Sequence, residues 1–547
     1  MAAFDTHEVF NQPPPYEDVD LFASDAALRE AVRANGGTAP ESVLSAFGRH
    51  WGRAEMFEQA RLANDFTPRL KAFDRQGHRR DVVEFHPAYH FFMAESMKAG
   101  LHCMTWRADA DRAPAPAEVA RAARYYMVAQ VENGHMCPIT MTRAAVGALR
   151  LEPALAHLLM PKIVSHDYDP RFIPWPQKTA MTLGMGMTEK QGGTDVRANA
   201  TTAARDGEAY RITGHKWFMS APMCDAFLVL AQAGDGLTCF LMPRFAPDGQ
   251  VNALRFQRLK DKLGNRSNAS SEVEFADAYA VRVGAEGAGI RTILEMVQLT
   301  RLDCAIASAG LMRMALAQAV HHTRHRLAFQ KKLVDQPLMR AVLADMALDV
   351  EGALAAVMRL CRSFDQAAAD PQEAARARLL TPVIKYWICK IAPALTYEAM
   401  ECLGGNGYVE DGIMARLYRE APVNAIWEGS GNVMCLDVLR ALAKDSEAAL
   451  AVLKQLAAET ADLSGAPETV SLIAGILGSA QAEPQARLAV ERIALLAAAA
   501  ALRASAPSFV AEAFARARLA GPRGATYGAA AVTPDRAASI VDRALPA

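Results

Sequence analysis

The segment Met185-Gly-Met-Thr-Glu-Lys-Gln-Gly-Gly-Thr-Asp195 places two hydroxyl side chains, Thr188 and Thr194, around a pair of glycines. Glycine lets backbone amides approach a ligand closely, and hydroxyl groups supply further hydrogen bonds. Such a loop suits a ring cofactor that carries phosphate, although a glycine-rich polar segment is more often only a turn. Two later segments favour the cofactor: Gly-His-Lys-Trp-Phe-Met-Ser at 214–220 and the octet around Glu428.

Length and composition indicate a chain of several domains. It has 547 residues, of which 51% are hydrophobic, so large cores can form. A net charge of −1 gives no overall field that would attract nucleic acid or an acidic membrane. The cysteines are 9 in number and scattered singly, which indicates reduced thiols and neither a disulfide framework nor a zinc site. The N-terminus does not resemble a signal peptide, and no apolar run approaches the roughly 20 residues of a membrane span. We therefore expect a cytoplasmic protein that does not contact the membrane.

The spacing of apolar residues changes along the chain in a definite order. The first 50 or so residues are irregular, and helical spacing dominates 43–159, as in the windows 52–63 and 116–130. Short β-branched and aromatic runs then predict an antiparallel sheet or barrel, with strands at 209–213, 226–231, 237–242, 254–259 and 271–275. Long helices expected at 290–328, 337–367 and 374–403, with a short one at 433–443, are typical of a bundle, and an Ala-rich tail follows. The expected domains are an N-terminal arm and helical domain (1–184), a β-barrel (185–288), a helix bundle (289–444) and an extra C-terminal helical domain (445–547).

Glu428 is the main candidate for a catalytic carboxylate. It lies in Asn424-Ala-Ile-Trp-Glu-Gly-Ser-Gly-Asn432, after Trp427 and before two glycines. Burial beside an apolar surface would raise its pKa towards that of a working base. The same octet also suits a solvated glutamate in a turn.

Three other motifs leave their role open. Leu403-Gly-Gly-Asn-Gly-Tyr408 follows a helical pattern and lacks the G-x-G-x-x-G spacing, so a Rossmann site is not indicated. The histidines at 321, 322 and 325 have no carboxylate at zinc-site spacing, and we expect no metal. Arg326 and Phe329 could clamp an adenine and its phosphates, or could be an arginine whose stem covers a core residue.

Taken in order, these segments resemble the acyl-CoA dehydrogenase family. The 188–195 loop matches the flavin-binding pattern T-E-x-x-x-G-[ST]-D, and 214–220 matches the strand G-x-K-x-W-I-T. Lys262-Leu-Gly-x-Arg266, Arg326-x-x-Phe329, Leu403-Gly-Gly-x-Gly-Tyr408 and Glu428-Gly429 follow at the family's spacing. The resemblance covers roughly residues 60 to 440.

The resemblance implies an α+β, mostly helical fold: an N-terminal helical domain, a central antiparallel β-barrel and a C-terminal four-helix bundle. It also implies FAD, with its adenine reaching a neighbouring subunit of a homotetramer. Thr188 would bind the flavin ring, Ser220 would lie near its reactive nitrogen, and Thr194 would face the pyrophosphate. Glu428 aligns with the base that removes the α-proton of an acyl-CoA while the β-hydride goes to the flavin. The residues that the resemblance assigns to the cofactor are Met185, Met187, Thr188, Gly193, Thr194, Phe218, Met219, Ser220, Arg326, Phe329, Gly404, Gly405, Trp427, Gly429, Ser430 and Asn432.

Departures from the family pattern indicate one branch of it. Lys190 stands where proline is usual, Phe218 where tryptophan is usual, Gln330 where glycine is usual and Glu401 where glutamine is usual. The spelling M-T-E-K-Q-G-G and the opening Val9-Phe-Asn-Gln-Pro13 are similar to the AidB-like proteins of the bacterial adaptive response to DNA alkylation. These also carry a long N-terminal arm and an added C-terminal helical domain. Glu401 would need a nearby cation if it approached cofactor phosphate.

The expected function is that of an FAD-dependent flavoprotein with acyl-CoA dehydrogenase-type chemistry on a short branched substrate such as isovaleryl-CoA. One alternative is an ordinary short- or branched-chain acyl-CoA dehydrogenase that binds no DNA. Another is a flavin oxidase acting on small electrophiles such as nitroalkanes, although that branch usually has aspartate at the Glu428 position. The sequence leaves the physiological substrate and the electron acceptor open.

The end of the chain carries a local positive charge. From residue 484 it holds 8 arginines against 4 acidic residues, so 8 − 4 gives +4. The planar guanidinium fork suits phosphate, and such contacts release counterions. The arginines could instead only keep an Ala-rich helical segment soluble. The resemblance to the AidB-like proteins, together with this charge, implies weak, sequence-independent binding of double-stranded DNA, with Arg516, Arg518 and Arg523 as the candidate contacts.

Overall fold

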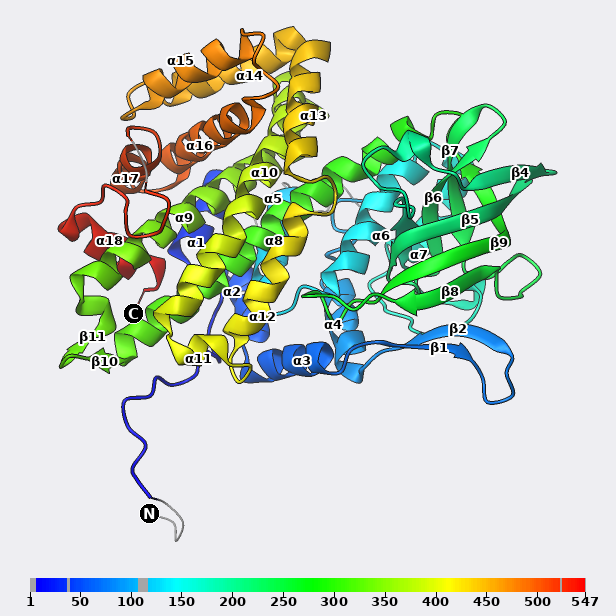
Figure 1. Ribbon diagram of the computed structural model, residues 1–547, viewed down its shortest axis with the longest axis horizontal. Helices are drawn as coiled ribbons and strands as arrows, with labels where there is room; N and C mark the ends of the chain where they lie inside the picture. The colour runs from blue at the N-terminus through cyan, green and yellow to red at the C-terminus, as the bar shows by residue number, and fades with distance from the viewer. Residues whose placement is uncertain (1–5, 37–39, 107–116, 522–523, 547) are drawn as a thin grey trace. The chain divides into compact units, whose positions relative to one another are not determined.

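The computed structural model describes residues 6–36, 40–106, 117–521 and 524–546 (Figure 1). The chain forms two compact units. Unit 1 comprises Met1–Met56, Pro114–Val131 and Cys304–Ala547, and unit 2 comprises Phe57–Ala113 and Glu132–Asp303. No helix among the described residues is long and apolar enough to cross a membrane.

A closed ring of strands forms the core of unit 2. The β4, β5, β9, β7 and β6 strands pair in that order, and β6 pairs again with β4; β3 and β8 are added on β6 and β9. The ring closes because β6 pairs with β7 along its whole length and with β4 through Thr202 and Gln232. Most pairings are antiparallel as expected, but β3 and β4 run parallel to β6. The strands of this barrel are β3 (Leu183–Gly186), β4 (Thr202–Asp206), β5 (Ala209–Ser220), β6 (Ala226–Ala233), β7 (Gly236–Pro243), β8 (Leu254–Leu259) and β9 (Ser270–Val283).

A β-hairpin in unit 2 interrupts the region 43–159, in which the sequence has mainly helical spacing. Strands β1 (Arg69–Phe73) and β2 (Arg79–Glu84) pair antiparallel, and Gly77 at φ 88° closes the turn between them. The hairpin is held in part by Arg79, whose guanidinium binds the Phe256 carbonyl at 2.8 Å, a contact that local periodicity cannot reveal. The remaining elements of unit 2 are α3 (Ala54–Asp65), which begins in unit 1, α4 (Pro87–Lys98), α6 (Met136–Leu149), α7 (Pro153–Ile163), η1 (Trp175–Gln177) and η2 (Val196–Ala198).

Long helices form unit 1, and α9 lies at their centre. Between Leu343 and Met358 every residue of α9 is buried, as in a helix surrounded by protein on all sides. Its neighbours include α10, α16 and α18. The long helices are α8 (Gly289–His325), which begins in unit 2, α9 (Pro337–Gln366) and α10 (Pro371–Cys402). The shorter elements are α1 (Ala26–Ala34), α2 (Glu41–Trp51), α5 (Ala117–Ala129), β10 (Leu327–Ala328), β11 (Lys331–Lys332), η3 (Leu333–Asp335), α11 (Gly405–Tyr408), α12 (Ile413–Glu420), η4 (Ala421–Ala425) and α13 (Gly431–Lys444).

The Ala-rich end of the chain is helical, as the sequence predicts. It forms α14 (Ser446–Glu459), α15 (Ala466–Leu477), α16 (Ala486–Ser505) and α17 (Ser508–Arg518), and the first three pack against one another (Figure 1). A further helix, α18 (Pro534–Ala544), lies in the Gly- and Ala-rich stretch that follows.

The expectation that the first 50 residues are irregular is wrong from Ala26 onwards. Helix α1 is capped by Asp25, whose carboxylate accepts a hydrogen bond from the Leu28 amide at 2.9 Å. A second helix, α2, follows. The irregular stretch therefore ends just before residue 25.

Candidate active site

The loop that follows β3 in unit 2 is a closed turn. Glu189 and Gly192 exchange two backbone hydrogen bonds, at 3.2 and 3.1 Å. Gly192 has φ 147°, and a Cβ on Gly193 would lie 2.3 Å from the Thr188 hydroxyl oxygen. Both glycines are therefore needed for the loop to close over Thr188. Thr194 follows them and is exposed.

A buried ion pair fixes this loop to the barrel. The Lys216 ammonium on β5 donates to Glu189 Oε1 at 2.7 Å, and both side chains are 0% exposed. Glu189 also accepts hydrogen bonds from the amides of Ala200 (2.7 Å) and Thr201 (3.2 Å). Burial alone raises the pKa of Glu189, but these hydrogen bonds outweigh it and lower the pKa to about 2. Burial also lowers the pKa of Lys216, and Glu189 opposes that shift.

An exposed apolar platform lies beside the loop at the end of β5. Phe218 is 47% exposed, whereas its neighbour Met219 is buried, as the alternation of a strand requires. Ser220 is half-buried and its hydroxyl lies 3.1 Å from that of Ser270. Met185 and Met187 are also half-buried. A solvent-exposed aromatic ring flanked by methionines and hydroxyls fits a planar, polar-edged ring such as flavin.

Glu428 lies in a strained turn of unit 1. Its φ of 58° is unusual for a non-glycine residue, and Gly429 follows at φ 101°. The buried Lys385 on α10 donates to the carbonyls on both sides of it: to Trp427 O at 2.9 Å and to Gly429 O at 2.5 Å. This clamp holds the main chain and fixes the direction in which the half-buried Glu428 side chain leaves it.

Neighbouring contacts extend the support of this turn. The Trp427 indole donates to Asn424 Oδ1 at 2.9 Å, and the Asn424 amide donates to the Ser308 hydroxyl at 3.1 Å. Ser430 is the N-cap residue of α13. Asn432 accepts a hydrogen bond from Arg487 of α16 at 2.8 Å, so the C-terminal segment reaches the octet.

Arg326 and Phe329 lie in and beside the β10–β11 hairpin. Phe329 at φ 52° and Gln330 at φ 63° form its two-residue turn, and the positive φ explains why glycine is usual at 330. Phe329 is 94% exposed. Arg326 instead turns to the N-terminal arm, where it donates to the Asn11 carbonyl at 2.6 Å.

Gly404 precedes α11 with φ 60°, and Gly405 is exposed beside it. Asn406, one residue further on, donates to the Gln12 side chain at 3.3 Å. The N-terminal arm therefore contacts both the β10–β11 hairpin and this glycine segment.

The predicted site residues thus fall into two groups, one in each unit. Unit 2 brings together Met185, Met187, Thr188, Gly193, Thr194, Phe218, Met219 and Ser220 at the loop and the end of β5. Unit 1 holds Glu428 with Trp427, Gly429, Ser430 and Asn432, and elsewhere the Arg326–Phe329 and Gly404–Gly405 segments. Two buried lysines, Lys216 and Lys385, are functional residues that the sequence motifs did not predict. Their positions in the sequence could have indicated burial, since Lys216 falls at an inward position of a strand. Lys385 lies within the apolar run Ile384-Lys-Tyr-Trp387.

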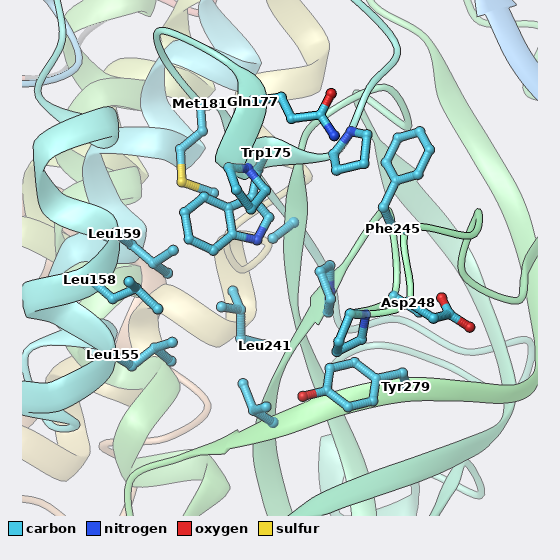
Figure 2. Close-up of a pocket in the computed structure, with 18 residues that line it drawn as sticks. Leu155, Leu158, Leu159, Trp175, Gln177, Met181, Leu241, Phe245, Asp248 and Tyr279 are labelled. Atoms are coloured by element: carbon cyan, nitrogen blue, oxygen red, sulfur yellow. The ribbon is translucent and has the colours of Figure 1, made fainter.

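A separate apolar pocket of about 530 Å³ lies in unit 2 (Figure 2). Leu155, Leu158 and Leu159 of α7 face Trp175, with Tyr279 of β9 and Leu241 of β7 on the other wall. None of the residues predicted for FAD or catalysis lines it. The described residues contain no group of three or more His, Cys, Asp or Glu side chains that could hold a metal.

The C-terminal arginines require a correction. Arg518 is buried and pairs with Asp345 at 2.5 Å and Asp349 at 2.7 Å on α9, so it cannot contact a DNA backbone in this structure. Arg503 and Arg543 are also neutralised, by Asp462 and by Glu30 with Glu351. Arg516 is exposed, with no ion pair to any described residue. Arg523 lies outside the described residues. The net charge of +4 counted for this segment therefore includes arginines that acidic residues elsewhere in unit 1 neutralise.

Family models match three consecutive parts of the chain. The model described as adaptive response protein AidB N-terminal domain matches residues 11–170. The acyl-CoA dehydrogenase middle domain matches residues 184–278, and the acyl-CoA dehydrogenase C-terminal domain matches residues 287–443.

Individual relatives agree with these models. The chain is 51% identical to AidB of Escherichia coli (strain K12) over 444 residues, which are 81% of each protein. It is 31% identical to acyl-CoA dehydrogenase family member 11 of Caenorhabditis elegans, covering 78% of this chain and 70% of that one. The crystal structure of Caenorhabditis elegans ACDH-11 in complex with C11-CoA superposes with a TM-score of 0.85 at 28% identity, over 96% of this chain and 95% of that chain. The chain therefore belongs to the acyl-CoA dehydrogenase family, in its AidB-like branch, and has the fold of that family.

Proposed function

We propose that the chain dehydrogenates an acyl-CoA thioester, with Glu428 as the base that removes the α-proton. The chain is an oxidoreductase of a family whose cofactor is FAD, and the Phe218 platform and the Thr188–Gly193 turn fit that cofactor. When bound, FAD supplies the hydride acceptor that side chains lack. The observation that carries the proposal is the clamp of Lys385 on the carbonyls of Trp427 and Gly429.

The clamp supports a role for Glu428 in proton transfer. A general base must be held within hydrogen-bond reach of the proton that it abstracts. Main-chain hydrogen bonds on both sides of Glu428 restrict where its carboxylate can lie without using that carboxylate as the acceptor.

Two kinds of acyl group are candidates for the substrate. Isovaleryl-CoA is the short branched substrate that the resemblance implies, whereas the structural neighbour from Caenorhabditis elegans was solved with C11-CoA. Anaerobic titration of the purified protein with isovaleryl-CoA, longer acyl-CoAs and a nitroalkane separates the candidates. We expect flavin bleaching with at least one acyl-CoA; bleaching by the nitroalkane alone would instead indicate the flavin oxidase.

The β10–β11 hairpin, with Phe329 at its tip, supports assembly into a homotetramer. Phe329 is 94% exposed at the tip of a hairpin, and the resemblance has the Arg326–Phe329 pair contact the cofactor of a neighbouring subunit. An exposed aromatic on a rigid turn is costly in a monomer and suits a protein contact. Light scattering should give the mass of four chains, and a monomer that retains FAD would contradict this assembly.

We propose DNA binding as a second function, restricted to the exposed arginines of the tail. The specific observation is Arg516, exposed on the last turn of α17, with Arg536 exposed on α18. Their number predicts weak affinity with a shallow salt dependence. Binding isotherms on duplex DNA at several salt concentrations should show weaker binding for Arg516→Ala/Arg536→Ala than for Arg75→Ala, an exposed arginine of the β1–β2 turn. Equal isotherms for the two variants would remove the tail from the function.

A further inference from the structure

Strand β5 holds the 188–195 loop, which we call the cofactor loop, through three consecutive residues. The loop residues 188–190 run past residues 217–215 in the opposite direction, and each meets one partner. The three hydrogen bonds are Trp217 N to Thr188 O (2.8 Å), Lys216 Nζ to Glu189 Oε1 (2.7 Å) and Lys190 N to His215 Nε2 (3.0 Å). The register of the loop is thus fixed residue by residue.

The third of these bonds is one that the usual family pattern cannot form. Position 190 is where the family pattern has proline, and proline has no N–H to donate. Lys190 supplies that N–H, and His215 accepts it through Nε2. The imidazole can accept there only when Nε2 carries no proton, so the proton of the neutral ring is on Nδ1.

The backbone of His215 is itself well anchored. The Thr201 hydroxyl donates to its carbonyl at 3.0 Å, and its amide donates back to that hydroxyl at 3.2 Å. Opposite His215 on β9 stands Glu274, whose carboxylate lies 3.9 Å from the Lys190 ammonium. These hydrogen bonds hold the main chain of His215, so its ring can position the loop.

We propose that His215 is a positioning residue for FAD: its neutral ring holds the cofactor loop through the Lys190 amide, and protonation of the ring releases that contact. This inference rests on the proposed function, because it concerns how the loop receives FAD. Protonated His215 has N–H groups on both ring nitrogens, so Nε2 then faces the Lys190 N–H as a second donor. The loop loses one of its three anchors, and FAD affinity falls as the pH is lowered.

Other charged groups near His215 do not reproduce this pH dependence. The pKa of Glu189 is lowered to about 2, so its carboxylate stays ionised throughout the range between pH 5 and 8. Glu274 faces His215 from β9, and Arg255 of β8 is the residue opposite Glu274. A Lys190→Pro variant keeps all of these charged groups on the barrel. It removes the N–H that His215 accepts and the lysine side chain.

The test is titration of the apoprotein with FAD at pH 7.5 and pH 5.5, followed by flavin fluorescence. We expect His215→Phe and Lys190→Pro each to weaken FAD binding about three- to tenfold at pH 7.5, as the loss of one hydrogen bond predicts. The double variant should be no weaker than either single one, because both remove the same bond. Wild-type affinity should fall at pH 5.5, and the affinity of the variants should not.

Two controls keep the outcome specific. His215→Gln offers a carbonyl acceptor that does not titrate, so it should restore affinity without restoring the pH dependence. His78→Phe alters an exposed histidine of the β1–β2 turn in the same unit and should behave as wild type. If His215→Phe folds and binds FAD like wild type at both pH values, or if Lys190→Pro keeps the full pH dependence, the anchor is wrong while the proposed function stands. A wild-type protein that binds no FAD overturns both.

Discussion

Two buried lysines hold the two halves of the predicted site in different ways. In the barrel, Lys216 pairs with the carboxylate of Glu189, and both are removed from solvent. In the helical unit, Lys385 binds two main-chain carbonyls, those of Trp427 and Gly429. The first arrangement uses an acidic side chain to fix a loop, whereas the second fixes a turn through the main-chain carbonyls on either side of an acid. The difference separates a glutamate that shapes the cofactor loop from one that we propose as a base.

The largest expected effect comes from breaking the charged clamp. Lys216→Met leaves the Glu189 carboxylate buried without its cation, which should cost about 3–5 kcal/mol in the free energy of unfolding. Denaturant unfolding of the apoprotein measures this loss. The neutral pair Glu189→Gln/Lys216→Met should recover most of it, because no uncompensated charge remains. A Lys216→Met protein as stable as wild type would mean that the ion pair does not organise the loop.

Breaking the carbonyl clamp should cost less stability and more activity. Lys385→Met removes the donor to two carbonyls, so we expect about 2 kcal/mol of destabilisation. Because the Glu428 turn then loses its fixed direction, acyl-CoA-dependent flavin reduction should slow by more than tenfold, although FAD binding through the barrel loop stays the same. Stopped-flow reduction and FAD titration on one preparation separate the two effects. Equal losses in reduction rate and FAD affinity would show that this clamp is not specific to Glu428.

The predicted site residues on the barrel side lie in contiguous motifs, whereas those on the helical side depend on a distant residue. The 188–195 loop and strand β5 carry their residues in two short motifs, so the sequence alone could predict that these residues lie in two local groups. Lys385 is more than 40 positions before the turn that it holds, and nothing in the apolar run around it identifies its partners. Contacts between distant segments, rather than local periodicity, place such residues.

The same limit explains the failures in the fold. The β1–β2 hairpin and helix α1 depend on Arg79, Asp25 and other groups that bind partners elsewhere or cap a short element. Arg518 was counted as a surface charge because its partners on α9 are about 170 residues away in the sequence. Net charge of a segment is therefore a poor guide to its surface charge when buried acids on another helix neutralise it.

The smallest expected effect is a loss of folding stability at low pH. The pKa of Glu189 is lowered to about 2 in the folded state, so its ion pair contributes stability above the unfolded-state value near 4.5 and loses it as the pH falls towards 2. At pH 3.5 the expected loss is on the order of 1 kcal/mol in the free energy of unfolding. Denaturant unfolding at pH 7 and pH 3.5 should show this difference in wild type and a smaller one in Glu189→Gln/Lys216→Met. An equal loss in both proteins would assign the acid sensitivity to other groups.

The central claim is that Glu428 is the base, and the reduction of bound flavin by an acyl-CoA tests it most directly. Glu428→Gln keeps the size of the side chain but cannot accept the proton, so it should retain FAD at the wild-type ratio and bleach at least about a hundredfold more slowly under anaerobic conditions. Glu447→Gln, an exposed glutamate in the first turn of α14, is the matched control and should bleach at the wild-type rate. A Glu428→Gln protein that bleaches as fast as wild type would contradict the account.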